Sequence, residues 1–149
     1  MSVRIIGLGN VFMSDSGFGP YVVRVLEAFY ETPADVCMID GGAPGVDLPS
    51  HLTAAEASIV IEASPGAGVP GDIHVSRASE DEAMFISVVP EWCATGVTLS
   101  RPVRTAIAPV VALVVAELER LGEPPRLRAE PRHPDTWWER VETDAAVAV

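Results

Sequence analysis

The stretch that decides the fold covers residues 3–19 and reads VRIIGLGNVFMSDSGFG. It begins with a run of apolar, β-branched residues and continues into Gly-x-Gly at 7–9, a pattern that is typical of a buried strand ending in a tight turn. Because glycine has no Cβ, backbone or a ligand can come close to the end of this strand. Ser14 and Asp15 precede an apolar face at helical spacing, so we expect one of them to cap a helix over residues 17–30. A strand, a glycine turn and a capped helix form the opening unit of an α/β sheet.

Four more strands and two more helical segments follow this unit. The chain predicts a three-layer α/β/α sandwich with a central, largely parallel five-stranded sheet and helices on both faces. We expect one α/β domain over residues 1–122, followed by a loosely held Pro- and acid-rich tail over 123–149, where Trp137 and Trp138 could dock a last short helix. The further strands are expected at 34–40, 57–63, 72–77 and 83–89, with helical segments at 46–52 and 102–121.

The charge balance of the chain excludes two classes of partner. There are 21 acidic and 10 basic side chains, which give a net charge of −11 and repel both phosphate backbones and anionic lipid. We therefore expect neither nucleic acid nor a membrane as a partner, and the lack of a long apolar run predicts a cytoplasmic protein. Cys37 and Cys93 have no C-x-x-C spacing, so we expect reduced thiols in the core and no structural zinc site.

Glu62 is the side chain that most needs an explanation. The run at 57–63, ASIVIEA, places it near the carboxyl end of a strand that is otherwise apolar. A carboxylate in this position must pair, bind a cation or reach solvent, because burying it alone is costly. In α/β sheets, ligands bind at the carboxyl ends of strands, so both Glu62 and the loop at 7–19 belong to the region where chemistry is expected.

Several ordered motifs resemble one family. Gly-x-Gly-Asn ending at Asn10, four residues, then Asp-x-Gly-x-Gly from Asp15 is similar to the opening of the hydrogenase maturation endopeptidases, which trim the C-terminal tail of the nickel-iron hydrogenase large subunit. The resemblance continues through DGGAPG at 40–45, PGDIH at 70–74, and VPE and GVTLS between 89 and 100, and it covers about residues 1–122. It implies a phosphorylase/hydrolase-like fold and, as partner, a precursor large subunit that supplies its own nickel.

The resemblance also implies a set of site residues. The family has three metal ligands, and the position of the first, directly after Asp15, holds Ser16 here. The second falls on Glu62, where the family more often has Asp, and the third, a histidine from a helical segment, has no counterpart in the short stretch at 78–82. By resemblance, Asp15 and Glu62 carry catalysis and face the metal or substrate. The target is then bound by Gly9, Asn10, Asp40, Gly41 and Gly42.

Two physical readings follow from the incomplete ligand set. Either the remaining carboxylates meet at the sheet edge and the precursor's nickel completes the site, or the chain is a non-catalytic relative that acts as a binding or chaperone factor for the same target. Two other classes of protein, a dinucleotide-binding domain and a serine hydrolase, fit the sequence less well. Phe12 takes the place of the third glycine of a dinucleotide-binding fingerprint, and Ser16 does not lie in a nucleophile elbow.

Overall fold

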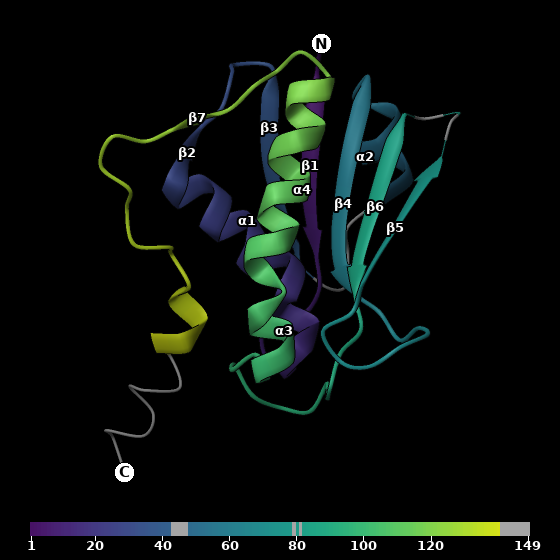
Figure 1. Cartoon of the computed structure of the whole chain (residues 1–149), viewed down its shortest axis with the longest axis vertical. Helices are drawn as coiled ribbons and strands as arrows, with labels where there is room; N and C mark the ends of the chain where they lie inside the picture. The colour runs from purple at the N-terminus through teal and green to yellow at the C-terminus, as the bar shows by residue number, and fades with distance from the viewer. Residues whose placement is uncertain (43–47, 79, 81, 141–149) are drawn as a thin grey trace.

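The five main strands form one sheet in the order β3-β1-β4-β6-β5 (Figure 1). The computed structural model describes residues 1–42, 48–78, 80 and 82–140. β1, β3, β4 and β6 run parallel, whereas the edge strand β5 runs antiparallel to β6. The predicted fold class, a five-stranded and largely parallel sheet, is confirmed. The strands are β1 (Val3–Leu8), β3 (Val36–Gly42), β4 (Ala57–Ala63), β5 (Ile73–Ala78) and β6 (Ala83–Val88).

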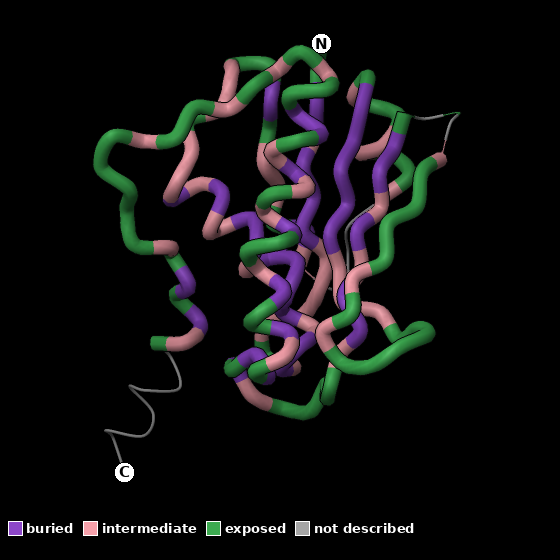
Figure 2. Tube along the Cα trace, viewed as in Figure 1, coloured by how far each residue is buried: buried purple, intermediate pink, exposed green. Residues whose placement is uncertain are grey.

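Helices lie on both faces of this sheet. α1 (Phe18–Phe29) and α4 (Ile107–Arg120) cover one face together with the short α3 (Arg101–Thr105), and α2 (Leu48–Thr53) lies behind the other face (Figure 1). The main core fills the space between the first face and its helices. Figure 2 shows that most of the central strands β1 and β4 is buried. The core includes Val3, Ile5, Ile59, Ile61 and Ile86 from the sheet, and Phe18, Val22, Leu26, Val110, Val114 and Leu118 from the helices.

Two predicted helix features differ from the structure. The single helix expected over 102–121 is divided at Ala106 into α3 and α4. Pro109 explains the break, because it has no N–H to donate to the carbonyl of Thr105 four residues earlier. At the start of α1 the N-cap residue is Gly17, the last residue of a 3-10 turn over Ser14–Gly17, and neither Ser14 nor Asp15 caps the helix.

The tail is held more firmly than the sequence suggests. β2 (Tyr30–Glu31) pairs antiparallel with β7 (Arg126–Leu127), and the backbone N–H of Arg128 donates to the carbonyl of Phe29 at 2.8 Å. Further along, Trp138 is 1% exposed and packs edge-on against Tyr21. The docking of Trp138 that the sequence suggested is present, and residues 126–138 contact the domain at several points. Strands of two residues carry too little pattern to be recognised in a sequence.

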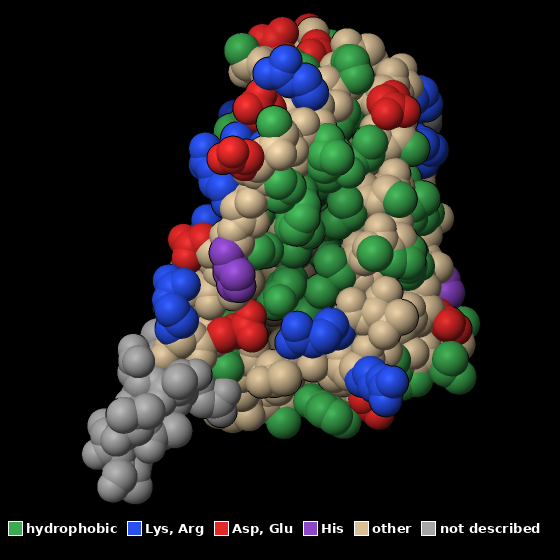
Figure 3. Space-filling model, turned by 60° about the vertical axis from the view of Figure 1, so that its left-hand side comes forward, with side chains coloured by type: hydrophobic (Ala, Val, Ile, Leu, Met, Phe, Trp, Pro, Cys, Tyr) green, Lys and Arg blue, Asp and Glu red, His purple; other side chains and the backbone are tan. Residues whose placement is uncertain are grey.

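The surface has one apolar furrow beside the tail. Figure 3 shows hydrophobic side chains gathered along it, with charged side chains at its lower end. A cavity of about 230 Å³ lies in this region between α1, α4 and β7 and is lined by Val25, Phe29, Tyr30, Ile107, Ala108, Val111 and Leu127.

Cys37 and Cys93 are both exposed, which corrects their predicted place in the core. Within the described ranges, no helix is both long and apolar enough to cross a membrane.

One charged network ties α4 to the strand that edges the sheet. Glu117 is buried, and its carboxylate accepts hydrogen bonds from Arg77 of β5 at 2.5 Å and from Arg120 at 2.6 Å. Arg120 also pairs with Glu82 at 2.5 Å. The hydrogen bonds from Arg77 hold the pKa of Glu117 at about 2, well below its ordinary value of 4.5.

Replacing Glu117 by Ala is expected to lower the free energy of unfolding by about 2 kcal/mol near pH 7. The two arginines stay partly exposed and can rehydrate, which limits the loss. Because the pKa is depressed, the contribution of Glu117 is fully present above pH 4.5 and is lost as the pH falls toward 2. Urea unfolding of both proteins at pH 7 and pH 3 measures this difference. A gap between them that stays constant over this range would contradict the assignment.

Candidate functional site

Two glycines of the stretch at 7–19 are required by close backbone contacts. Gly9 has φ +144°, and a Cβ there would lie 1.7 Å from the carbonyl oxygen of Ser16. A Cβ on Gly19, in the first turn of α1, would lie 2.3 Å from the carbonyl oxygen of Ile61 in β4. The glycines therefore let the loop close on itself and let α1 begin directly against the central strands. This accounts for their spacing without a bound ligand.

Asp15 connects this loop to a distant part of the chain. Its side chain is fully buried, and its Oδ2 accepts hydrogen bonds from the backbone N–H of Glu91 at 2.9 Å and of Trp92 at 3.2 Å. The N–H of Ser100 donates to Oδ1 at 2.7 Å and the Ser100 hydroxyl donates to Oδ2 at 2.8 Å. Both oxygens are engaged and shielded from solvent. These contacts give Asp15 a structural role, and its predicted catalytic and metal-ligating role stays a prediction.

Asn10 and Ser16 close the same loop from inside. The backbone N–H of Asn10 donates to the Ser16 hydroxyl oxygen at 3.1 Å, and the Asn10 side-chain oxygen accepts from the N–H of Phe12 at 3.0 Å. At the position where a first metal ligand was expected, the hydroxyl of Ser16 thus serves the loop conformation. Both residues are half-buried, so the loop keeps a partly open outer surface.

The second predicted segment, Asp40 to Gly42, lies beside this loop. In the sheet, Gly7 pairs with Asp40 and Leu8 with Gly42, and the N–H of Gly9 donates to the Gly42 carbonyl at 3.3 Å. The exposed Asp40 carboxylate accepts from the Gly42 N–H at 3.1 Å and pairs with Arg24 at 3.3 Å. The structure therefore brings the two predicted substrate-binding segments together. The rest of that motif, residues 43–45, lies outside the described residues.

Glu62 lies at the same edge of the sheet, and it is the carboxylate that remains open there. It is half-buried at the end of β4, and within the described part of the chain it forms no hydrogen bond or ion pair. Burial raises the pKa of the Glu62 carboxyl above its ordinary value. A partly dehydrated carboxylate without a partner is the kind of group that occurs at functional sites.

The register of the sheet places two polar side chains in line with Glu62. Glu62 pairs with Ser87 of β6, which pairs in turn with His74 of β5, so all three lie in one row on the same face. The ring Nε2 of His74 lies 2.7 Å from the carbonyl oxygen of Ala67. The second histidine, His51, lies on α2 with its Nδ1 2.7 Å from Nη1 of Arg4. Neither lies in a metal-ligand group with Glu62.

The described side chains do not make up a metal site of this chain's own. A metal site needs about three protein ligands, and no group of three His, Cys, Asp or Glu side chains with suitable placement occurs among the described residues. Glu62 is an open oxygen donor, whereas Asp15 is saturated and Ser16 bonds its own loop. The described residues of this chain therefore do not hold a metal ion by themselves.

Sequence reasoning missed the partner of Asp15. Ser100 stands at the N-cap position of α3, as its place before an apolar run predicts, but its hydroxyl binds Asp15 and not the helix backbone. The two residues are 85 positions apart. Nothing in the local pattern around either residue indicates this contact.

In sequence, this chain is similar to proteins of hydrogenase expression, formation and maturation. No family model matches it. The hydrogenase expression/formation protein HupM of Azotobacter chroococcum is 28% identical over 90% of this chain and 78% of its own length. HoxM of Cupriavidus necator is 35% identical, but this chain spans only 39% of its length. The hydrogenase 2 maturation protease of Escherichia coli is 28% identical over 60% of this chain and 55% of its own length.

Comparisons of structure lead to proteins of the same kind. The hydrogenase maturating endopeptidase HybD from E. coli superposes with a TM-score of 0.80, at 22% identity, over 87% of this chain and 99% of its own. The hydrogenase 2 maturation peptidase from a Thaumarchaeota archaeon gives a TM-score of 0.70 at 24% identity over 82% and 99%. At these identities the likeness establishes the fold.

Replacing Asp15 by Asn is expected to lower the free energy of unfolding by about 3 kcal/mol, because an amide group turned toward buried N–H donors leaves them unsatisfied. Asp40→Asn is the matched control. It makes the same chemical change at an exposed carboxylate of the same sheet edge, where we expect a loss of about 0.5 kcal/mol. Urea unfolding of the two variants tests the structural role, and equal losses would refute it.

Proposed function

We propose that this chain, which is related in sequence and fold to the hydrogenase maturation proteases, is a peptidase that recognises the nickel-loaded precursor large subunit of a nickel-iron hydrogenase and removes its C-terminal extension. Two of the relatives reported above are named hydrogenase expression/formation proteins, and three are named hydrogenase maturation proteases, peptidases or endopeptidases. The ordered glycine motifs and the sheet topology support the same assignment.

The observation that carries the proposal is the state of Glu62. Its carboxylate is half-buried, has no partner within the described structure and has a raised pKa. It lies at the carboxyl edge of the sheet, beside the glycine loop and the segment from Asp40 to Gly42. In α/β sheets this edge is where ligands bind, because the loops after several strands meet there.

A carboxylate in this state is suited to general-base catalysis. In peptide hydrolysis, Glu62 accepts a proton from a water molecule as the water oxygen bonds to the scissile carbonyl carbon. The C–N bond then breaks and the proton passes to the departing amine. Burial moves the pKa of Glu62 toward the working pH, which favours proton transfer in both directions. Gly9, Asn10, Gly41 and Gly42 are proposed to border the bound extension.

Nickel enters this proposal as part of the substrate. The protein offers one open carboxylate in the described site, which is too few donors for a metal of its own. A nickel ion already held by the precursor can accept an oxygen ligand, and the open carboxylate of Glu62 is of the kind that supplies one. The protein would then distinguish a precursor that carries nickel from one that does not, because only the nickel-loaded precursor offers this contact to Glu62.

A second candidate function is binding without cleavage. Two observations favour it: Asp15 is saturated by backbone and serine hydrogen bonds, and Ser16 stands at the expected position of the first metal ligand. A chaperone or specificity factor for the same precursor would need the loops at the sheet edge but no catalytic carboxylate.

The Glu62→Gln variant separates the two functions. If Glu62 is the general base, the substitution is expected to slow removal of the extension by about a hundredfold or more, because general acid–base catalysis typically contributes that much. The measurement is the intact mass of nickel-loaded precursor large subunit after incubation with pure protein. Glu62→Asp keeps the carboxylate and is expected to retain measurable cleavage.

Glu119→Gln is the matched control, since Glu119 is an exposed glutamate of α4 on which cleavage should not depend. Full cleavage by Glu62→Gln would exclude the proposed role of Glu62. Absence of cleavage by the unmodified protein, together with co-elution of the precursor, would establish the binding function instead.

A further inference from the structure

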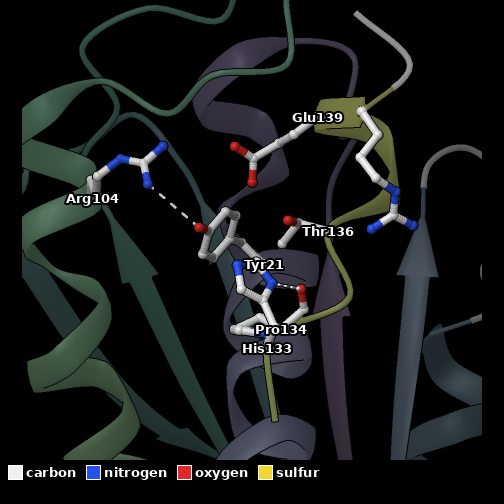
Figure 4. A pocket seen from close by; sticks show the side chains of 7 residues that line it. Tyr21, Arg104, His133, Pro134, Thr136 and Glu139 are labelled. Atoms are coloured by element: carbon white, nitrogen blue, oxygen red, sulfur yellow. Dashed lines mark hydrogen bonds between the residues drawn. The ribbon is translucent and has the colours of Figure 1, made fainter. Parts of the chain in front are cut away.

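A pocket of about 660 Å³ lies between α1, α3 and the docked tail, away from Glu62. Tyr21 of α1 and Arg104 of α3 line one side, and His133, Pro134, Thr136 and residues of the last helical turn line the other (Figure 4). Neither the glycine loop nor the row of Glu62 contributes to its lining. The tail connects the two regions, because Trp137 packs edge-on against Phe12 of the glycine loop with ring centroids 5.8 Å apart.

Arg104 is held in place at this pocket by an aromatic side chain. Its guanidinium lies 5.7 Å from the centre of the Tyr21 ring, and its Nη1 donates to the Tyr21 hydroxyl at 3.4 Å. Tyr21 is in turn fixed by the buried Trp138, with ring centroids 6.3 Å apart. A guanidinium positioned in this way loses little conformational freedom when it binds a ligand.

The charge of Arg104 is not compensated by any described carboxylate. Arg4, Arg101 and Arg132 likewise form no ion pair with a described carboxylate, so Arg104 is one of four such arginines in a chain with 21 acidic and 10 basic residues. Arg140, which also lines the pocket, pairs with Asp135 at 3.1 Å. Ion pairs with carboxylates also engage Arg24, Arg77, Arg120, Arg126 and Arg128.

The other polar groups favour a singly charged ligand over a doubly charged one. Glu139 extends toward the pocket from the tail (Figure 4), and it has an interaction of its own. Its negative charge would repel a phosphate dianion more strongly than a carboxylate. The hydroxyl of Thr136 can donate a further hydrogen bond, and the faces of Tyr21 and Pro134 provide apolar walls for a peptide. His133 already donates from Nδ1 to the carbonyl oxygen of Pro134 at 3.0 Å, which leaves Nε2 of the neutral ring as an acceptor.

We infer that this pocket binds a carboxylate of a peptide segment, with Arg104 as the residue that pairs with it. The carboxylate can be a free chain end or an Asp or Glu side chain, because a guanidinium forms the same two parallel hydrogen bonds with each. This site goes beyond the proposed function, since it contains none of the residues assigned to cleavage, and it can be tested by binding alone.

The test uses three short peptides and NMR spectra of the full chain. Acetyl-trialanine with a free carboxylate and acetyl-Ala-Glu-Ala amide each carry one carboxylate, whereas acetyl-trialanine amide carries none. At least one carboxylate peptide is expected to shift the indole signal of Trp138 saturably at millimolar concentration, and the amide is not. The stronger of the two identifies the chain end or the side chain as the preferred source.

Arg104→Met is expected to weaken this binding about tenfold or more, as loss of a charge-assisted pair does. Arg101→Met is the matched control, because it removes the same charge from the same short helix outside the pocket lining and should change binding less than twofold. Unfolding curves of both variants check the fold. Equal weakening by the two variants, no saturable shift with either carboxylate peptide, or tighter binding of inorganic phosphate would overturn the inference.

Discussion

The carboxylate of Asp15 connects the glycine loop with the stretch from Glu91 to Ser100, which lies 76 to 85 residues further along the chain. It fixes the glycine loop to the backbone at Glu91 and Trp92 and to the start of α3 at Ser100. A buried carboxylate is tolerated because four donors surround it, so its charge is neutralised by hydrogen bonds without a cation. The relative positions of the glycine loop, the backbone at Glu91 and Trp92 and the start of α3 therefore depend on this one side chain.

This arrangement divides the residues of the glycine loop into two kinds of role. Gly9, Gly19, Asn10 and Ser16 determine the shape of the backbone, and Asp15 anchors it. Glu62 differs from them because it has no structural partner in the described chain. A sequence that carries the glycine motif and its Asp therefore has the means to fold in this way, whether or not it keeps a complete set of metal ligands.

Sequence patterns were sufficient for the sheet but not for contacts between distant segments. β4 has the predicted bounds, 57–63, because its run of β-branched residues is long and flanked by turns, and this placement brought Glu62 to the sheet edge correctly. The hydrogen bonds of Asp15 could not be predicted, because its partners lie 76 to 85 residues away. The division of the last helix was readable from Pro109, whereas the pairing of β2 with β7 was not.

The long sequence separation between Asp15 and Ser100 also bears on how the chain folds. Contacts between neighbouring segments close small loops and form early, whereas joining residues 85 positions apart requires that the intervening strands are already in place. We therefore expect the sheet and α1 to assemble first and the Asp15 anchor to form late, after the rate-limiting step. Its hydrogen bonds would then act mainly on the rate of unfolding, and so on the lifetime of the native protein.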